Sequence, residues 1–120
     1  MTLTTKRIYD EASEEDGTRV LVDRLWPRGI KKEDARIDYW LKELAPSHDL
    51  RKRYHGSGED FEDFVEAYRA ELDEPSEEAE EALETLKDLA RDGDVTLLYA
   101  AKDREKNNAE ALKRILAERL

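Results

Sequence analysis

The stretch that decides the fold reads Arg19-Val-Leu-Val-Asp-Arg-Leu-Trp-Pro-Arg-Gly29. Its apolar, β-branched beginning predicts a buried strand over residues 20–23. Charged and ring-bearing side chains gather at the carboxyl end of that strand: Asp23, Arg24, Trp26, Pro27 and Arg28. In an open α/β sheet, ligands bind outside the carboxyl ends of the strands. The stretch therefore predicts a binding site at this edge of a sheet.

Two further strands are expected around the first. Residues 6–9 form a short one, and the continuous apolar run at residues 95–101 predicts a buried one. Continuously apolar strands favour a mostly parallel sheet that is covered on both faces. The polar segment 10–18 is short for a parallel crossover, so an antiparallel arrangement of the first two strands stays open.

Helical patterns fill the rest of the chain. The clearest spans residues 60–72, where apolar side chains recur at helical spacing. Ser76 is expected to cap a second helix that ends at Gly93, and Ser47 to cap a short one. We also expect a short helix capped by Asp38 and a last helix over residues 105–120. The fold class is therefore α/β: a small, mostly parallel sheet of about three strands flanked by helices, in a single domain over residues 1–120.

Composition narrows the class of protein. A chain of 120 residues suits one domain with one core. It has no cysteine, which excludes a disulfide framework, a thiolate nucleophile and Cys-ligated zinc. No apolar run approaches the roughly 20 residues that span a bilayer, and the N-terminus lacks the apolar core of a signal peptide. We therefore expect a cytoplasmic protein that does not enter a membrane.

The negative charge is concentrated in one segment. The net charge is −10; residues 59–94 hold 16 acidic and 3 basic groups, while residues 1–58 and 95–120 are slightly basic. Such a chain does not bind duplex DNA through its overall charge. The acidic segment is either a solvated helical face or a surface for a basic protein partner.

The strand at residues 95–101 repeats the pattern of the strand at residues 20–23. It runs into Lys102-Asp103-Arg104, and Asn107 then opens the last helix. If the two strands are neighbours, Arg24, Arg28 and Lys102 share one crevice with the helix N-terminus near Asn107, and Trp26 lies beside them. Cationic side chains around a helix N-terminus form an anion site. The pattern predicts a phosphate or carboxylate ligand. The alternative is that Asp23 and Asp103 pair with these cations and only neutralise the sheet edge.

Catalytic candidates are few. Asp23 and Asp103 are a carboxylate pair of the kind used in acid–base work or Mg²⁺ binding, and His55 lies in a glycine-rich segment. No carboxylate follows in a fixed metal-binding spacing, so no metal site is predicted. Glycine motifs for phosphates or dinucleotides are absent, and the cofactor stays unassigned. The sequence leaves open whether the protein is an enzyme.

Several motifs together resemble the YeaO-like family of prokaryotic proteins, which is built on a domain of unknown function. The motifs are the stretch at residues 19–29, Trp40-Leu-Lys-Glu-Leu-Ala-Pro-Ser47, Leu50-Arg51, and Thr96-Leu-Leu-Tyr-Ala-Ala-Lys-Asp103 with Asn108-Ala109. The resemblance covers nearly the whole chain and implies a compact α/β domain, without a reaction, substrate or cofactor. Family members often carry a His-Asp pair where this chain has His55-Gly56, which argues against a catalytic role for His55.

The expected function is therefore the binding of a small anion at the strand ends, with or without catalysis. The alternative is a non-catalytic interaction module that uses its acidic helical segment. Binding of single-stranded RNA, with Trp26 stacking on a base, is a third reading that the acidic net charge disfavours.

Overall fold

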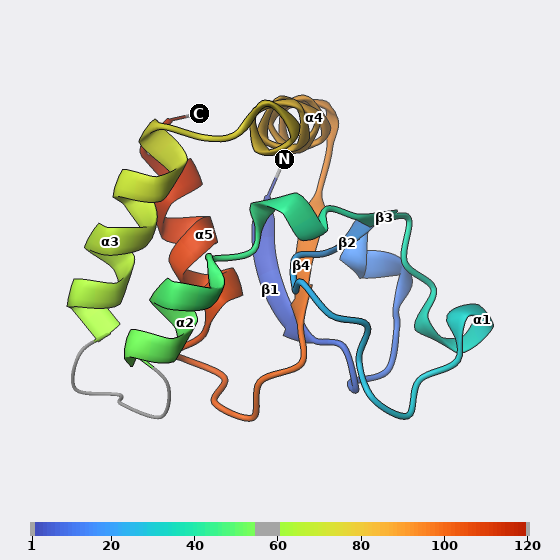
Figure 1. Cartoon of the computed structure of the whole chain (residues 1–120). Helices are drawn as coiled ribbons and strands as arrows, with labels where there is room; N and C mark the ends of the chain where they lie inside the picture. Colours follow the sequence, from blue (N-terminus) through green and yellow to red (C-terminus); the bar gives the residue numbers. More distant parts are fainter. Residues whose placement is uncertain (1, 55–60, 120) are drawn as a thin grey trace.

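Four parallel strands form the sheet of the computed structural model, which describes residues 2–54 and 61–119 (Figure 1). They are β1 (Leu3–Arg7), β2 (Thr18–Leu21), β3 (Tyr39–Trp40) and β4 (Val95–Tyr99), in the order β1-β4-β2-β3. Leu97 of β4 is the register partner of both Thr5 and Val20. The α/β class and the parallel sheet are confirmed.

The first two strands are parallel but not adjacent, because β4 lies between them. The question of an antiparallel pair is thereby settled. The short connection over residues 8–17 leads from the end of β1 back to the start of β2. It contains only one 3₁₀ turn, η1 (Glu14–Asp16). No helix of the ordinary crossover kind is needed to reach the start of β2.

The strand count was wrong by one, because β3 forms where we expected a helix capped by Asp38. The Asp38 carboxylate accepts a hydrogen bond from the Arg19 backbone N–H at 2.9 Å instead of capping a helix. The backbone N–H groups of Asp38 and Leu41 donate to the carbonyls of Arg19 and Leu21. These bonds hold Tyr39 and Trp40 against the free edge of β2, and only the 3₁₀ turn η2 (Lys42–Leu44) follows.

Helices cover one face of the sheet. They are α2 (His48–Tyr54), α3 (Phe61–Asp73), α4 (Glu77–Asp92) and α5 (Asn108–Ala117). In Figure 1, α2, α3 and α5 stand together on one side, and α4 is seen end-on near the start of the strands. Val20, Leu97 and Tyr99 of the sheet form one buried cluster with Phe64 and Leu112. Each such apolar side chain contributes about 1.5–3 kcal/mol when fully buried.

Three of these helices begin at the polar side chains expected there, Ser47, Ser76 and Asn107. Ser47 Oγ accepts from the Leu50 N–H and Ser76 Oγ from the Ala79 N–H. The last helix begins later than residue 105, because Asn107 is its N-cap and accepts from the Glu110 N–H at 2.8 Å. Within the described parts of the chain, no helix is both long and apolar enough to span a membrane.

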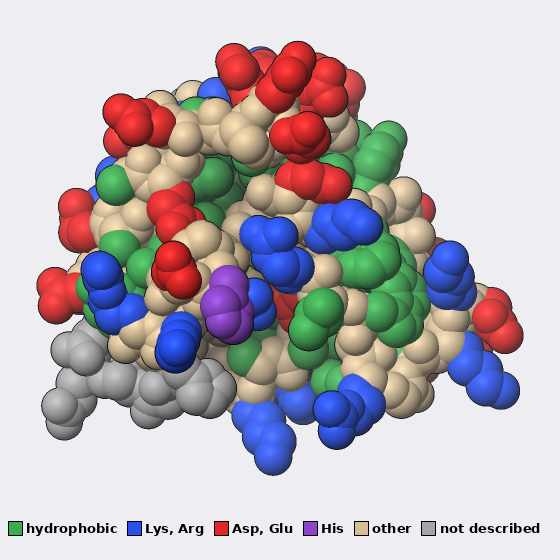
Figure 2. All heavy atoms as spheres, viewed as in Figure 1, with side chains coloured by type: hydrophobic (Ala, Val, Ile, Leu, Met, Phe, Trp, Pro, Cys, Tyr) green, Lys and Arg blue, Asp and Glu red, His purple; other side chains and the backbone are tan. Residues whose placement is uncertain are grey.

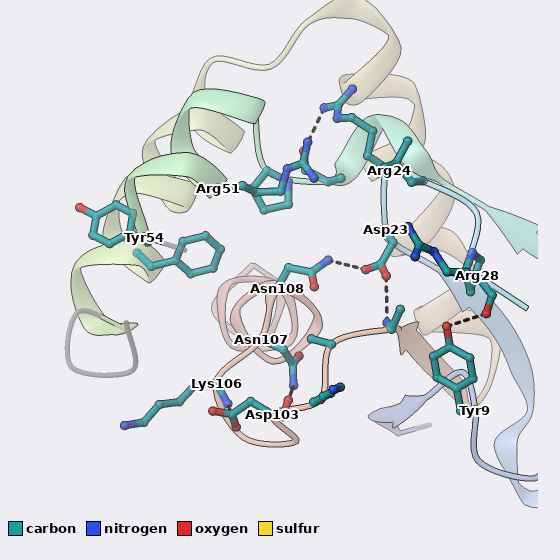
Figure 3. A pocket seen from close by; sticks show the side chains of 18 of the residues that line it. Tyr9, Asp23, Arg24, Arg28, Arg51, Tyr54, Asp103, Lys106, Asn107 and Asn108 are labelled. Atoms are coloured by element: carbon teal, nitrogen blue, oxygen red, sulfur yellow. Dashed lines mark hydrogen bonds between the residues drawn. The ribbon is translucent and has the colours of Figure 1, made fainter. Parts of the chain in front are cut away.

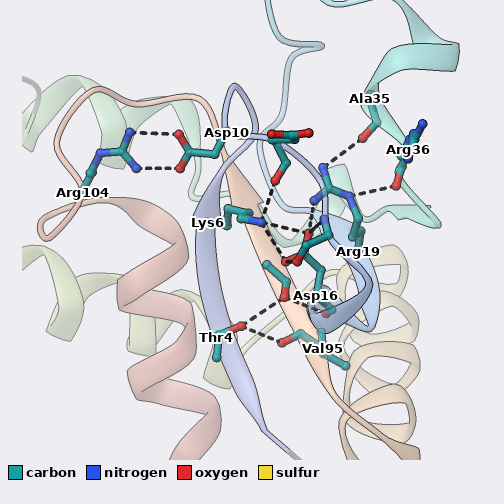
Figure 4. Close-up of polar contacts among 12 residues, drawn as sticks. Thr4, Lys6, Asp10, Asp16, Arg19, Ala35, Arg36, Val95 and Arg104 are labelled. Carbon is teal, nitrogen blue, oxygen red and sulfur yellow. Dashed lines mark hydrogen bonds and ion pairs between the residues drawn. The ribbon is translucent and has the colours of Figure 1, made fainter.

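The opposite face of the sheet is covered by connecting segments and by the four-residue α1 (Lys32–Ala35). At its centre lies an ion pair between Asp16 and Arg19, 7% and 5% exposed, joined at 2.5 Å (Figure 4). Arg19 also donates to the backbone carbonyls of Ala35 and Arg36, at 3.0 Å each. Lys6 binds the other oxygen of Asp16 at 2.9 Å. These polar bonds act together with a small apolar cluster on the same face, which contains Ile8, Leu21, Ala35 and Leu98.

These contacts set the protonation of Asp16. Burial by itself would raise the pKa of this carboxyl, but hydrogen bonds from Lys6, from the Ser13 backbone and from Arg19 outweigh it and lower the pKa to about 2. The pKa in the unfolded chain is close to 3.8. The ionised carboxylate therefore stabilises the fold above pH 3.8, and this contribution is lost as the pH falls through about 2.

We expect the Asp16→Asn variant to be less stable than the parent protein at pH 6. The difference between the two free energies of unfolding should narrow by about 2 kcal/mol between pH 5 and pH 2. The narrowing follows because protonation removes from the parent the charge that the variant already lacks. Urea unfolding at several pH values measures both free energies. Glu11→Gln, an exposed neighbour, is the control and should show no such gap. A gap that stays constant over this range contradicts the account.

Candidate functional site

A pocket of about 870 Å³ opens at the carboxyl ends of β2 and β4 (Figure 3). We call it the strand-end pocket. The residues after β2 and after β4 form two of its walls, and α2, α3 and the start of α5 close the others. Its charged and aromatic lining residues are Tyr9, Asp23, Arg24, Trp26, Arg28, Arg51, Tyr54, Phe61, Phe64, Lys102, Asp103 and Lys106. The predicted neighbourhood of the two strand ends is therefore present.

Asp23 connects the three elements that meet at the pocket. One carboxylate oxygen accepts from the Ala100 backbone N–H at 2.9 Å, and the other accepts from the Asn108 side-chain amide at 3.0 Å. The indole N–H of Trp40 donates to the Asp23 carbonyl at 2.7 Å. Asp23 thus ties the end of β2 to the end of β4 and to the first turn of α5 (Figure 3).

The environment of Asp23 also changes its acidity. Burial raises the pKa of this carboxyl, and the hydrogen bonds from Asn108 and Ala100, together with the charge of Arg51, only partly oppose that effect. A carboxyl with a raised pKa in a pocket has the character of a general acid or base. The same two hydrogen bonds also make it a structural joint between strands and helix.

The three predicted cationic residues all line the strand-end pocket. The side chains of Arg24, Arg28 and Lys102 form no ion pair with any residue that the structure describes. Arg24 donates only a long hydrogen bond, at 3.5 Å, to the Ala45 carbonyl. The alternative in which Asp23 and Asp103 neutralise these cations is therefore not what the structure shows.

Asp103 and Asn107 have local roles. One oxygen of Asp103 accepts from the backbone N–H groups of Glu105 and Lys106, at 2.9 and 3.0 Å, which closes a turn before α5. These two hydrogen bonds lower the pKa of Asp103. Asn107 is 5% exposed, and its amide both caps α5 and donates to the Asp103 carbonyl. Asn107 therefore shapes the rim of the pocket. Its amide oxygen and its amide nitrogen both already form hydrogen bonds within the protein.

Trp26 lies between the pocket and the loop-covered face. Its ring meets that of Trp40 edge-on, with centroids 5.4 Å apart, and its indole N–H donates to the Ile30 carbonyl at 2.7 Å. It is half-buried and lines the pocket next to Pro27. Of the two histidines, His48 is exposed at the start of α2, and His55 lies outside the residues that the structure describes.

Arg51 is a pocket residue that the prediction of binding residues missed. It lies on α2, is half-buried, and extends toward Asp23 and Arg24 in Figure 3. Its Nε is fully buried and has no hydrogen-bond partner among the residues that the structure describes. The sequence offered one signal, the Leu50-Arg51 motif, but nothing in the spacing showed that α2 packs beside the end of β2.

Charge is unevenly distributed over the face of the molecule that Figure 2 shows. In Figure 2, acidic side chains crowd over α4 at the top, and Lys and Arg side chains gather in the centre and along the bottom. The bottom is where the strands end (Figure 1). An acidic protein therefore presents a basic surface around the strand-end pocket.

Comparison with known proteins finds relatives over the full length. The family model described as the inactive DUF488-N3 subclade matches residues 2–120. The chain is 47% identical to "Uncharacterized protein YeaO" of Escherichia coli (strain K12) over 112 residues, 93% of this chain and 94% of the relative. It is 49% identical over 57 residues, 48% of each chain, to "Uncharacterized protein Rv3073c" of Mycobacterium tuberculosis. No solved structure matches.

We expect Asp23→Asn to lower the free energy of unfolding by about 1–3 kcal/mol at pH 7, because an amide can accept only one of the two hydrogen bonds and turns a donor toward the other. Rotating Asn108 to compensate would break its bond to the Val22 carbonyl. Urea unfolding measures the loss.

Asp103→Asn is the matched control, because a single oxygen of Asp103 accepts both of its hydrogen bonds and the amide oxygen of Asn can do the same. We expect its stability to stay within about 0.5 kcal/mol of the parent. Equal losses in the two variants would contradict the assignment of Asp23 as a joint.

Proposed function

We propose that the strand-end pocket of this chain, which belongs to the YeaO-like family and matches its inactive DUF488-N3 subclade, binds a small anion, a phosphate or a carboxylate. The word "inactive" in the subclade's description favours binding without turnover. In that case Asp23 is a positioning residue. Duplex DNA is not proposed as a ligand, because the net charge of −10 opposes it. The absence of cysteine fits a reducing cytoplasm.

The observation that carries the proposal is the buried Nε of Arg51, which has no partner within residues 2–54 and 61–119. A buried donor without an acceptor costs free energy, about 1–3 kcal/mol or more when the group is charged. The guanidinium of Arg19, by contrast, is fully engaged. Each of its three nitrogens donates a hydrogen bond, either to the Asp16 carboxylate or to a backbone carbonyl. An anion at the end of β2 would supply the acceptor that Arg51 lacks.

The surroundings of Arg51 support the same ligand. Arg24, Arg28, Lys102 and Lys106 line the same pocket, and their side chains make no ion pair with the described residues. Elsewhere, by contrast, Arg69, Arg114 and Arg119 are paired with carboxylates. Guanidinium groups match the geometry of phosphate and carboxylate oxygens.

A second candidate is the interaction module that presents the acidic helical segment to a basic protein. It is favoured by Glu77, Glu78, Glu80 and Glu81, which are exposed on α4 and form no ion pair with the described residues. If the interaction module is the function, neutralising these four glutamates abolishes capture of the protein partner. If anion binding is the function, the same change leaves the affinity for the anion intact.

We expect sulfate and phosphate to raise the thermal unfolding temperature of the parent protein, because a ligand that binds only the native state stabilises it. Arg51→Gln should weaken binding by at least about tenfold, since a charge-assisted hydrogen bond is lost. Isothermal titration calorimetry at fixed ionic strength measures both affinities.

Lys52→Gln is the control, because Lys52 is the next residue of α2, is exposed, and does not line the pocket. It removes the same charge at nearly the same place. Equal weakening by the two variants would mean that the anion responds only to overall charge, and the site would be rejected.

We also expect the affinity for sulfate to fall as the pH rises from 4 toward 7. The raised pKa of Asp23 means that its charge develops above the ordinary carboxyl range, and the ionised carboxylate then repels the bound anion. Sulfate stays a dianion throughout this range, so the pH dependence reports on the protein. Calorimetry at several pH values measures it, and Asp23→Asn should flatten the profile. A profile that is unchanged in this variant contradicts the role of Asp23.

A further inference from the structure

The charge of the strand-end pocket exceeds what a carboxylate needs. Five cationic side chains line it, Arg24, Arg28, Arg51, Lys102 and Lys106, against the two carboxylates Asp23 and Asp103. The lining therefore carries a net charge of +3. A single carboxylate brings one negative charge, whereas a phosphate monoester brings about two near neutral pH. The balance favours a phosphate over a carboxylate.

The size of the pocket exceeds what inorganic phosphate needs. Pockets that hold organic ligands measure about 300–1,000 Å³, and the strand-end pocket, at about 870 Å³, lies in that range. A phosphate group fills only a small part of such a volume. The remaining space fits an organic group attached to the phosphate.

One wall of the pocket is aromatic. Tyr54, Phe61 and Phe64 line the pocket from α2 and α3, with the Tyr54 and Phe64 rings edge-on at 5.9 Å and the Phe61 and Phe64 rings stacked at 6.1 Å. In Figure 3, Tyr54 lies at the opposite end of the pocket from Arg28 and Tyr9. Flat ring systems pack well on aromatic side chains, whatever polar groups the rings carry.

One helix joins the two halves of the pocket. Arg51 and Tyr54 are three residues apart on α2 and therefore lie on the same side of the helix. Arg51 is directed toward the strand ends, and Tyr54 packs on α3. One helix thus contributes both a cation, Arg51, and an aromatic ring, Tyr54, to the lining of the pocket.

We infer that the strand-end pocket takes a phosphate ester of a flat ring compound, the class to which nucleoside monophosphates belong. The phosphate lies by Arg51 and Arg24, and the ring lies against the aromatic wall of Tyr54 and Phe64. This inference rests on the proposed function, since it names the ligand class of the same site.

The test compares four probes by calorimetry with the full chain at one ionic strength: inorganic phosphate, glycerol 3-phosphate, phenyl phosphate and adenosine 5′-monophosphate. We expect the two ring-bearing probes to bind at least about tenfold tighter than glycerol 3-phosphate. Tyr54→Leu should remove most of this advantage while the affinity for inorganic phosphate stays the same. Arg51→Gln should weaken all four probes.

Tyr39→Leu is the matched control, because Tyr39 is an exposed tyrosine outside the pocket and should leave every affinity unchanged. Circular dichroism shows whether Tyr54→Leu remains folded, and inorganic phosphate binding shows whether its anion site is intact. If Tyr54→Leu does not fold, the comparison of the four probes on the parent protein decides.

The outcomes separate the two proposals. If the four probes bind equally well, the ring inference is overturned and the anion site stands. If inorganic phosphate or glycerol 3-phosphate binds more tightly than the two ring-bearing probes, the inference is likewise overturned. If no anion binds at all, both proposals fall together.

Discussion

The buried ion pair between Asp16 and Arg19 is the interaction on which the rest of the structure depends. It joins η1 to β2, and Arg19 continues the contact to the carbonyls of Ala35 and Arg36, just ahead of β3. The Asp16 carbonyl in turn accepts from the Thr96 hydroxyl of β4 at 2.7 Å. Removing one partner of a buried pair leaves an uncompensated charge, which is strongly destabilising. One cluster thus fixes three connections on a face that has little helix.

This arrangement leaves the carboxyl edge of the sheet available for a ligand. The loop-covered face is held by the Asp16–Arg19 cluster near the start of β2 and by apolar contacts of Trp26 and Ile30, and none of these contacts uses the cations of the pocket. Asp23 needs only two hydrogen bonds to keep the segments after β2 and β4 in register with α5. The cations of the pocket are consequently not required for internal pairing, in contrast to those of the helical surface.

The sequence predicted the parts of the fold that depend on local chemistry. The apolar run before Asp23, the serine caps at Ser47 and Ser76, and the meeting of two charged strand ends all follow from patterns within a few residues. Asp38 was misread because the same residue type can cap a helix or accept from a neighbouring strand, and only the position of β2 decides between them. Arg51 was missed for a similar reason, since its role arises from packing between elements that are distant in the chain.

The uneven distribution of charge has a consequence for how a ligand arrives. On the face shown in Figure 2, acidic side chains crowd over α4, while the cations that line the pocket lie at the carboxyl ends of the strands. An anion far from the molecule is repelled by the net charge of −10, while one that approaches within a Debye length, about 8 Å at physiological ionic strength, feels mainly the local cations. Moderate salt weakens the distant repulsion more than the contact attraction, so the rate of capture passes through a maximum as salt increases.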